Sequence, residues 1–206
     1  MTAPVPDELP IFPLTGVLLL PRGLLPLNIF EPRYLAMVDH ALKTHRHIGM
    51  IQPRDDGTLH EVGCAGRITA FEETGDGRYL ITLTGVSRFR HSSELPQIEG
   101  FRRVKTDTQG FALDTEPTGC LSVNRPYMTR LLETYFDLQG LSCNWDMIQD
   151  ATDERLITCL SMVCPFSSQE KQALLETPTC HGRAQLFMTL LELAVQAQDT
   201  DSTSRH

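Results

Sequence analysis

The chain has 206 residues, of which 41% are hydrophobic and 21% charged, so it is long enough to bury a core and too apolar for a disordered protein. Its net charge of −8 is uneven, because residues 1–113 carry 13 acidic and 12 basic side chains whereas residues 114–206 carry 13 acidic and 6 basic. This balance disfavours a polyanionic partner such as nucleic acid, above all for the second half.

The first aliphatic segment, VLLLPRGLLPLNIFEPRYLAMV over residues 17–38, is interrupted by prolines at 21, 26 and 32. A proline inside a helix removes a backbone donor and clashes with the preceding turn, so the segment cannot be one membrane-spanning helix. Residues 1–10 hold no Lys or Arg, which argues against a signal peptide and for a cytoplasmic protein. The pattern predicts short strands joined by Pro and Gly corners, with a helix beginning at Pro32.

The remaining elements divide the chain into a strand-rich and a helical part. A strand or strand pair is expected at 9–20, a helix at 32–44 and further strands at 48–52, 63–71, 79–86 and 100–106. Residues 107–119 have turn formers and little periodicity and are predicted to be a linker. Beyond it, helices are expected at 121–140, from about 150, after the capping box Ser167–Glu170 and around 186–194.

This order of elements predicts an α+β protein with two subdomains. The predicted boundaries are 1–113 for the β-rich subdomain, 114–198 for a helical bundle and 199–206 for a disordered polar tail.

Sequence motifs of the common nucleotide-dependent and hydrolytic enzymes are missing. The chain contains no GxxxxGK[ST], GxSxG, HExxH or GxGxxG. Lys171 lies near Ser167 and Ser168, but the predicted position at a helix start indicates a solvated side chain rather than a Ser–Lys dyad. We therefore expect a non-enzymatic protein without a cofactor, and a small hydrolase with an unrecognised site is the weakest alternative.

Cysteine and histidine patterns do not predict a metal site. The six cysteines lack the close CxxC pairs typical of zinc sites, and Cys159 and Cys164 are five residues apart. His40, His45 and His47 cluster at the end of the first helix, where basic side chains complement the helix dipole. We expect reduced, metal-free thiols.

One basic segment pair suggests a nucleic-acid surface. Arg88 and Arg90 end one predicted strand, and Arg103 and Lys105 lie on the next. If the strands are neighbours, these cations converge near Phe89 and Phe101, as at single-strand binding surfaces. The competing interpretation, which the overall charge favours, is a solvated face paired with acidic side chains.

Several segments, taken in order, resemble one known family. The run LPIFPLTGVLLLPRGLLPLNIFEPRYLAMV, the strands Ile48–Gln52, Val62–Ile68 and Tyr79–Phe89, and the later Glu170–Glu176 are similar to the N-terminal substrate-binding domain of the Lon ATP-dependent proteases. The resemblance covers most of residues 9–195, and it is greatest to the stand-alone bacterial form that lacks ATPase and protease modules.

This resemblance implies a PUA-like, mostly-β pseudo-barrel followed by a C-terminal α-helical bundle. It also implies a non-catalytic binding module for peptides or unfolded protein segments, linked to protein quality control, with a protease or chaperone as a further partner. RNA binding through Arg88, Arg90, Arg103 and Lys105 is the alternative function.

Four residues are the candidates for peptide binding. Leu24 and Leu25 are expected in a loop bracketed by Gly23 and Pro26, where a Leu pair has few ways to be buried. Arg33 and Tyr34 either present a charge and an amphipathic ring at a groove mouth or have a structural role at the helix start, and the second interpretation is favoured.

Overall fold

The computed structural model describes residues 4–116, 122–142 and 150–203. The chain forms two compact units: Met1–Pro117 together with Thr158–Glu176, and Thr118–Ile157 together with Thr177–His206. The first unit therefore includes a segment from the second half of the sequence. This division differs from the contiguous subdomains 1–113 and 114–198 expected above.

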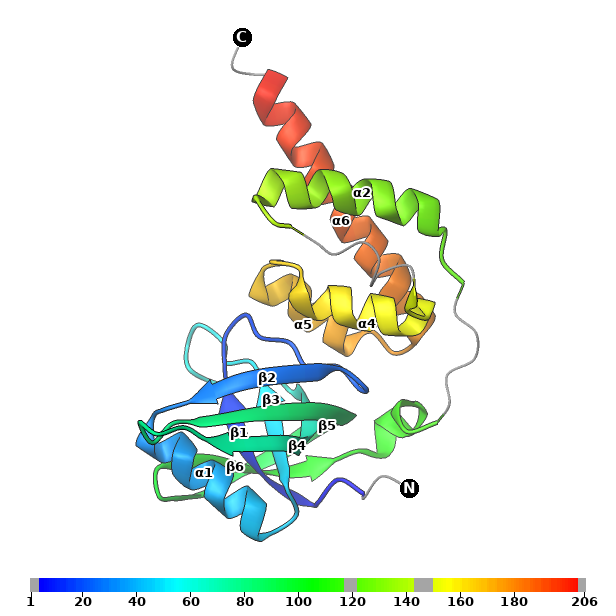
Figure 1. Ribbon diagram of the computed structural model, residues 1–206. Helices are drawn as coiled ribbons and strands as arrows, with labels where there is room; N and C mark the ends of the chain where they lie inside the picture. Colours follow the sequence, from blue (N-terminus) through cyan, green and yellow to red (C-terminus); the bar gives the residue numbers. More distant parts are fainter. Residues whose placement is uncertain (1–3, 117–121, 143–149, 204–206) are drawn as a thin grey trace. The chain divides into compact units, whose positions relative to one another are not determined.

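Six strands form the mixed sheet of the first unit (Figure 1). They are β1 (Glu8–Pro13), β2 (Leu24–Ile29), β3 (His47–Ile51), β4 (Val62–Glu73), β5 (Tyr79–Ile98) and β6 (Phe101–Asp107). The order is β2-β5-β4-β3-β1-β6, and an additional pairing of β5 with β6 closes all strands except β2 into a barrel. The strand β2 therefore pairs on one side only, with β5.

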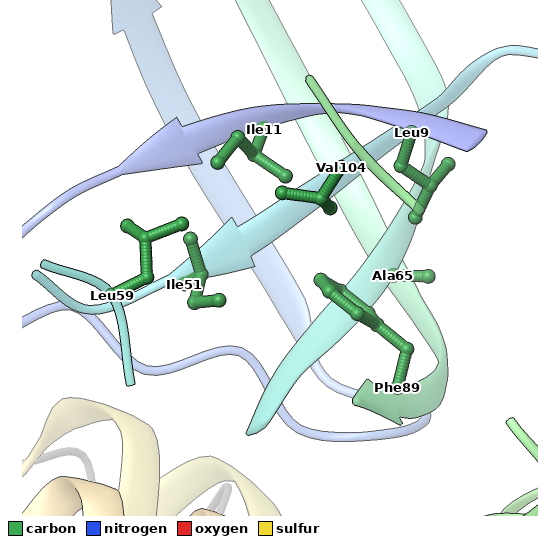
Figure 2. Close-up of a cluster of buried hydrophobic side chains, with 7 residues drawn as sticks. All are labelled: Leu9, Ile11, Ile51, Leu59, Ala65, Phe89 and Val104. Atoms are coloured by element: carbon green, nitrogen blue, oxygen red, sulfur yellow. The ribbon is translucent and has the colours of Figure 1, made fainter. Parts of the chain in front are cut away.

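The barrel interior is filled by aliphatic side chains around one phenylalanine (Figure 2). The cluster comprises Leu9, Ile11, Ile51, Leu59, Ala65, Phe89 and Val104. A β-carbon on Gly63 would lie 2.7 Å from the Phe89 ring, so the strand can pass this ring only with glycine at that position. Core packing thus explains Gly63, the first glycine of the VGCAG stretch at residues 62–66.

Helix α1 (Pro32–Lys43) connects β2 to β3. Pro32 occupies its first turn, where the missing N–H costs nothing, as the sequence predicts. Its apolar stripe of Tyr34, Met37, Val38 and Ala41 is buried. The segment Glu31–Tyr34 therefore joins strand β2 to a helix that packs on the barrel.

The predicted linker 107–119 is a packed element in its described part. Residues Gln109–Asp114 form the 3-10 helix η1, and the Asp114 carboxylate accepts hydrogen bonds from the buried Arg88. The sequence prediction was wrong here because the segment is held by a distant charged partner rather than by its own periodicity. Residues 117–119 of that stretch lie outside the described residues.

Helix α5 (Ser168–Glu176) belongs to the barrel unit through polar contacts with distant strands and loops. Ser167 and Glu170 form the predicted capping box, with the Glu170 carboxylate accepting from the Ser167 N–H at 2.8 Å. Gln172 donates to the Val62 carbonyl at 3.2 Å and accepts from Gln52. These contacts bind α5 to the entry of β4 and the end of β3.

The second unit contains the long helices α2 (Arg125–Gln139) and α6 (Cys180–Thr203), which contact each other. Helix α2 ends at Gly140 in the left-handed conformation that glycine adopts without strain. Helix α4 (Asp153–Val163) begins in this unit and ends in the first. The predicted disordered tail from residue 199 is helical to Thr203, and residues 204–206 lie outside the described part.

The predicted α+β class is confirmed, since a six-stranded sheet is followed in sequence by a helical region. Most predicted elements are present with boundaries shifted by a few residues. The main difference is β5, which continues to Ile98 and therefore reaches both β4 and β6.

Candidate functional site

The outer face of the β2–β5–β4 sheet carries a shallow groove of about 470 Å³. Its lining comprises Pro26, Leu27, Asn28, Ala70, Phe71, Glu72, Leu80, Ile81 and Thr82. Apolar residues dominate this lining, and the Leu80 side chain is 40% exposed. We call this surface the β2–β5–β4 groove.

Strand register places two rows of these residues on one face, whereas Leu27, Ile81 and Phe71 form the row between them and point to the other face. Pro26 lies opposite Thr82, which in turn lies opposite Ala70. Two residues further along each strand, the next row on this face is formed by Asn28, Leu80 and Glu72. Side chains directly opposite in antiparallel strands point to the same face, so these rows form one surface while Ile81 and Leu83 alternate into the core.

The predicted Leu24–Leu25 loop was wrong, because both residues begin strand β2. The reversal lies earlier, at Pro21–Arg22, where Arg22 has φ of 65° and the Gly23 N–H donates to the Leu20 carbonyl. Leu24 is nevertheless exposed, at 55%, and lies in register with Thr84 on the groove's face. Leu25 is half-buried opposite Leu83 and faces the other way.

Pro26 is compatible with its place in the middle of β2. Proline cannot donate to a ladder and is therefore confined to edge strands within sheets. In the described part of the chain, no strand pairs with the second edge of β2. The groove thus lies beside an open sheet edge with one backbone donor removed, which limits pairing with another strand.

Arg33 and Tyr34 lie at a different place from the groove. Tyr34 is buried against Phe12, with ring centroids 4.2 Å apart, and the Arg33 guanidinium lies 4.5 Å from the centre of the Tyr34 ring. Arg33 also pairs with Glu31 at 2.9 Å. Both line a second pocket, of about 280 Å³, together with Gly100 and Arg102. Of the four candidate peptide-binding residues, Leu24 lies on the groove's face and Leu25 faces away from it. The other two, Arg33 and Tyr34, lie at the second pocket.

The basic patch of the alternative, nucleic-acid interpretation is not formed. Arg88 is 2% exposed, and its Nη2 and Nε atoms donate to the Asp114 carboxylate at 2.8 and 2.9 Å. Arg88 also donates to the Leu175 carbonyl at 3.1 Å, so η1 and α5 cover it. The prediction failed because period-two spacing gives the face of a strand and not what covers that face.

The other three cations of the predicted patch do not compensate for the loss of Arg88. Arg103 is bonded to Glu8, and Arg90 makes a long contact of 3.9 Å to Glu61. Lys105 is exposed on β6. Strands β5 and β6 are neighbours as required, but the surface offers two open cations rather than four.

Lys171 is buried, which corrects the expectation of a solvated side chain. Its ammonium group donates to the Gly16 carbonyl at 2.8 Å, and burial lowers the pKa of the amine. This bond ties α5 to the loop after β1. The capping serine Ser167 bonds to Glu170 instead. The geometry therefore supports a structural role for Lys171 rather than a Ser–Lys pair.

After α1, the half-buried His45 and the buried His47 form a pair. The His47 ring nitrogen Nδ1 lies 2.7 Å from the His45 carbonyl, and the His47 N–H donates to the His45 ring at 3.1 Å. Burial, and next the neighbouring His47, lower the pKa of His45 to about 4. Burial also lowers the pKa of His47. Both rings are therefore neutral at pH 7.

Metal binding has no visible donor set in the described ranges 4–116, 122–142 and 150–203. No group of three or more His, Cys, Asp or Glu side chains there is placed to hold an ion. Cys64 and Cys164 are buried, Cys159 is exposed, and Cys120 and Cys143 lie outside the described residues. The expected absence of metal remains a prediction.

A helix that crosses a membrane must be both long and apolar. Within the part of the chain that the structure describes, no helix is both long and apolar enough to cross a bilayer.

The fold and the ordered sequence segments agree with one family. Residues 8–192 match the family described as ATP-dependent protease La (LON) substrate-binding domain, and the chain belongs to this family.

Curated relatives show the same relationship. Lon protease 2 of Myxococcus xanthus is 26% identical over 198 residues, which cover 91% of this chain and 24% of the relative. Lon protease of Desulfovibrio desulfuricans is 27% identical over 205 residues, covering 93% and 23%. The chain thus spans about a quarter of the length of the curated relatives it matches.

Solved structures share the fold. The crystal structure of a Lon N-terminal domain protein from Xanthomonas campestris superposes with a TM-score of 0.63 at 23% identity, over 88% of this chain and 97% of the other. The N-terminal domain of Mycobacterium avium complex Lon protease gives 0.63 at 15% identity, over 90% and 98%.

Sequence reasoning missed two central residues of the groove's face, Ala70 and Leu80. The alternation Leu80-Ile81-Thr82-Leu83 contains the necessary information, because Leu80 falls on the same face as Thr82, opposite the buried Ile81. An apolar residue on the polar face of an alternating strand is the signal that identifies an exposed apolar site.

Proposed function

We propose that the protein is a non-catalytic module that binds extended segments of unfolded polypeptide in the β2–β5–β4 groove. The observation that carries this proposal is the exposure of three apolar side chains, Leu24, Pro26 and Leu80, on one face of the sheet. An apolar surface that stays exposed in a folded unit marks an interaction site. The family description, which names substrate binding, supports the same assignment.

The groove fits an extended chain better than a compact ligand. It is shallow and runs over three neighbouring strands, and the apolar Leu24 and Pro26 lie two residues apart on β2 beside Leu80 of β5. Unfolded segments present alternating side chains at the same repeat. Glu72 and Asn28 supply polar atoms at one end of the groove for the backbone or polar side chains of the ligand.

The same proposal places the protein in the cytoplasm, in the selection of unfolded clients for protein quality control. The names of the relatives support that context, because they are Lon proteases and this chain matches about a quarter of their length. Nucleic acid is the competing ligand. The burial of Arg88 against Asp114 supports polypeptide over RNA.

Calorimetric titration of the full chain tests this function. An unfolded, casein-derived peptide and a short RNA are each titrated at about 50 mM and about 500 mM salt, because binding to phosphates weakens steeply over this range. We expect the peptide affinity to change little with salt and the binding to show a negative heat-capacity change, as apolar burial does. Absence of peptide binding, or salt-sensitive RNA binding alone, would contradict the proposal.

A further inference from the structure

The second pocket, of about 280 Å³, lies in the barrel unit where β1, α1 and β6 come together. Its lining includes Pro13 at the end of β1, Arg33 and Tyr34 in the first turn of α1, Gly100 before β6 and Arg102 in β6. The two arginines are its only charged lining residues within the described chain. We call it the Arg33–Tyr34–Arg102 pocket.

The Tyr34 hydroxyl is an unused hydrogen-bond donor at this pocket. The residue is 7% exposed, and its ring is held between Phe12 and the Arg33 guanidinium. Its hydroxyl has no hydrogen-bond partner among the described residues. The hydroxyl oxygen is not among the fully buried polar atoms that lack a partner, so solvent or a ligand in the pocket can reach it.

The charged side chains that act on the Tyr34 hydroxyl are those at or beside the pocket. Burial raises the pKa of Tyr34, and the charges that act on it are those of Arg33, Glu31 and Arg102. The phenol is therefore neutral at pH 7 and carries its proton. A neutral O–H beside two guanidinium groups is a donor set for an anionic oxygen.

Each arginine is paired outside the pocket, but only by exposed carboxylates. Arg33 pairs with Glu31, and Arg102 pairs with Glu94. Solvent-exposed pairs of this kind contribute about 0–1 kcal/mol, so a ligand can replace either partner at little cost. Arg102 uses Nε and Nη2 for Glu94, and no bond from its Nη1 is found in the described part of the structure.

The start of α1 adds to the positive character of the pocket. Its N-cap residue Glu31 makes no side-chain capping bond, and its first turn contains no acidic residue. The positive end of the helix dipole is therefore not compensated within the helix. In the neighbouring turn before Gly57, the Asp56 carboxylate accepts from the N–H and hydroxyl of Thr58 and is already engaged.

We propose that the Arg33–Tyr34–Arg102 pocket binds a carboxylate of the polypeptide ligand. The Tyr34 hydroxyl donates to one carboxylate oxygen, and the guanidinium of Arg102 or Arg33 donates to the other. A planar carboxylate matches the fork of a guanidinium, and the pocket volume admits one acidic side chain or one chain terminus. The identity of the ligand as a polypeptide rests on the function proposed above, whereas carboxylate binding rests on the pocket alone.

Small probes test the pocket without relying on the β2–β5–β4 groove. N-acetylglycine and its uncharged analogue N-acetylglycinamide are titrated into ¹⁵N-labelled full chain, and the amide resonances of Gly57 and Gly100 are followed. We expect saturable shifts of these two resonances with the carboxylate only. Equal shifts with both probes, or none with either, would overturn the proposal.

Three variants separate binding from structure. Tyr34→Phe removes only the unpartnered hydroxyl, so the melting temperature should stay the same or rise while the affinity for N-acetylglycine falls. Arg102→Gln should weaken binding about tenfold, the effect of one charge-assisted hydrogen bond. Arg103→Gln is the matched control, because Arg103 is the next residue on β6, is 20% exposed against 25% for Arg102, and is likewise paired with an exposed glutamate. Unchanged affinity in Tyr34→Phe and Arg102→Gln would refute the site.

Two amidated peptides that differ by one internal Glu→Gln change, and one peptide with and without C-terminal amidation, then identify the source of the carboxylate. Preference for the free terminus shows end recognition, and preference for Glu shows side-chain recognition. If peptides bind with no preference in either comparison, the pocket does not contribute to polypeptide recognition, although the groove does. If N-acetylglycine binds but no peptide does, the proposed function fails and the carboxylate site stands.

Discussion

Removal of the Asp114 charge should destabilise the barrel unit strongly. Asp114→Asn keeps the size of the side chain and one acceptor, but it leaves the Arg88 guanidinium buried without a counter-charge. In the wild type, both carboxylate oxygens accept from Arg88, at 2.8 Å from Nη2 and 2.9 Å from Nε. A third bond, from the Arg88 backbone N–H to Asp114, measures 2.9 Å.

The magnitude follows from the burial of the pair. Both side chains are nearly inaccessible, at 2% and 6%, so water cannot replace the lost partner. Breaking a buried ion pair from one side costs about 3–5 kcal/mol. Because whole domains are stable by about 5–15 kcal/mol, the variant should lose roughly a fifth or more of the total.

Urea denaturation followed by circular dichroism measures this loss. The double variant Arg88→Met/Asp114→Asn should be more stable than the sum of the single variants predicts, by about 2 kcal/mol or more, because it no longer buries an unpaired charge. The control Arg90→Met, two residues along β5 and exposed, should stay within about 0.5 kcal/mol of wild type.

A loss below about 1 kcal/mol in Asp114→Asn would refute the buried-pair account, since exposed pairs contribute no more than that. The same series bears on function. Arg88→Glu should prevent stable folding rather than selectively remove nucleic-acid binding. A folded Arg88→Glu protein that had lost RNA affinity would restore the alternative function.

Two further predictions concern stability. Gly85→Ala places a β-carbon 2.0 Å from the Leu20 carbonyl oxygen and should cost about 2–4 kcal/mol in urea denaturation, whereas Gly75→Ala, with nothing within 4 Å, should be close to neutral. Because His45 has a folded-state pKa of about 4, below its unfolded value of about 6.5, its stabilising effect is present above pH 6.5 and is lost as the pH falls from 6.5 to 4. The loss in unfolding free energy from this group between pH 7.5 and 5 should be at most about 2 kcal/mol, and His45→Gln should reduce it; an unchanged pH profile in that variant would contradict the assignment.

Local features of this fold were predictable because neighbouring residues determine them. Pro32 at a helix start, the Ser167–Glu170 capping box and Gly140 at a helix end each depend on backbone groups within a few positions. Strand β5 was identified from the alternation around Ile81. These signals are physical and short-ranged, so a single sequence contains them.

Long-range placements were not predictable in the same way. Arg88 and Asp114 are 26 positions apart, and Lys171 bonds to Gly16 across 155 positions. Nothing local distinguishes these side chains from solvated ones, and that is why both basic residues were assigned to the surface. The join of α5 to the barrel has the same origin, since it depends on Gln172 meeting Val62.

The central claim is that the β2–β5–β4 groove binds unfolded polypeptide, and a comparison of two leucine variants tests it most directly. Leu80 in the groove and Leu138 in α2 are both 40% exposed. Full burial of a leucine side chain contributes about 1.5–3 kcal/mol, so burying the exposed 40% of Leu80 under a peptide contributes about 0.6–1.2 kcal/mol. Leu80→Ser should therefore weaken peptide affinity about three- to eightfold, and Leu138→Ser by less than about twofold. Equal losses in the two variants, or none in Leu80→Ser, would contradict the account.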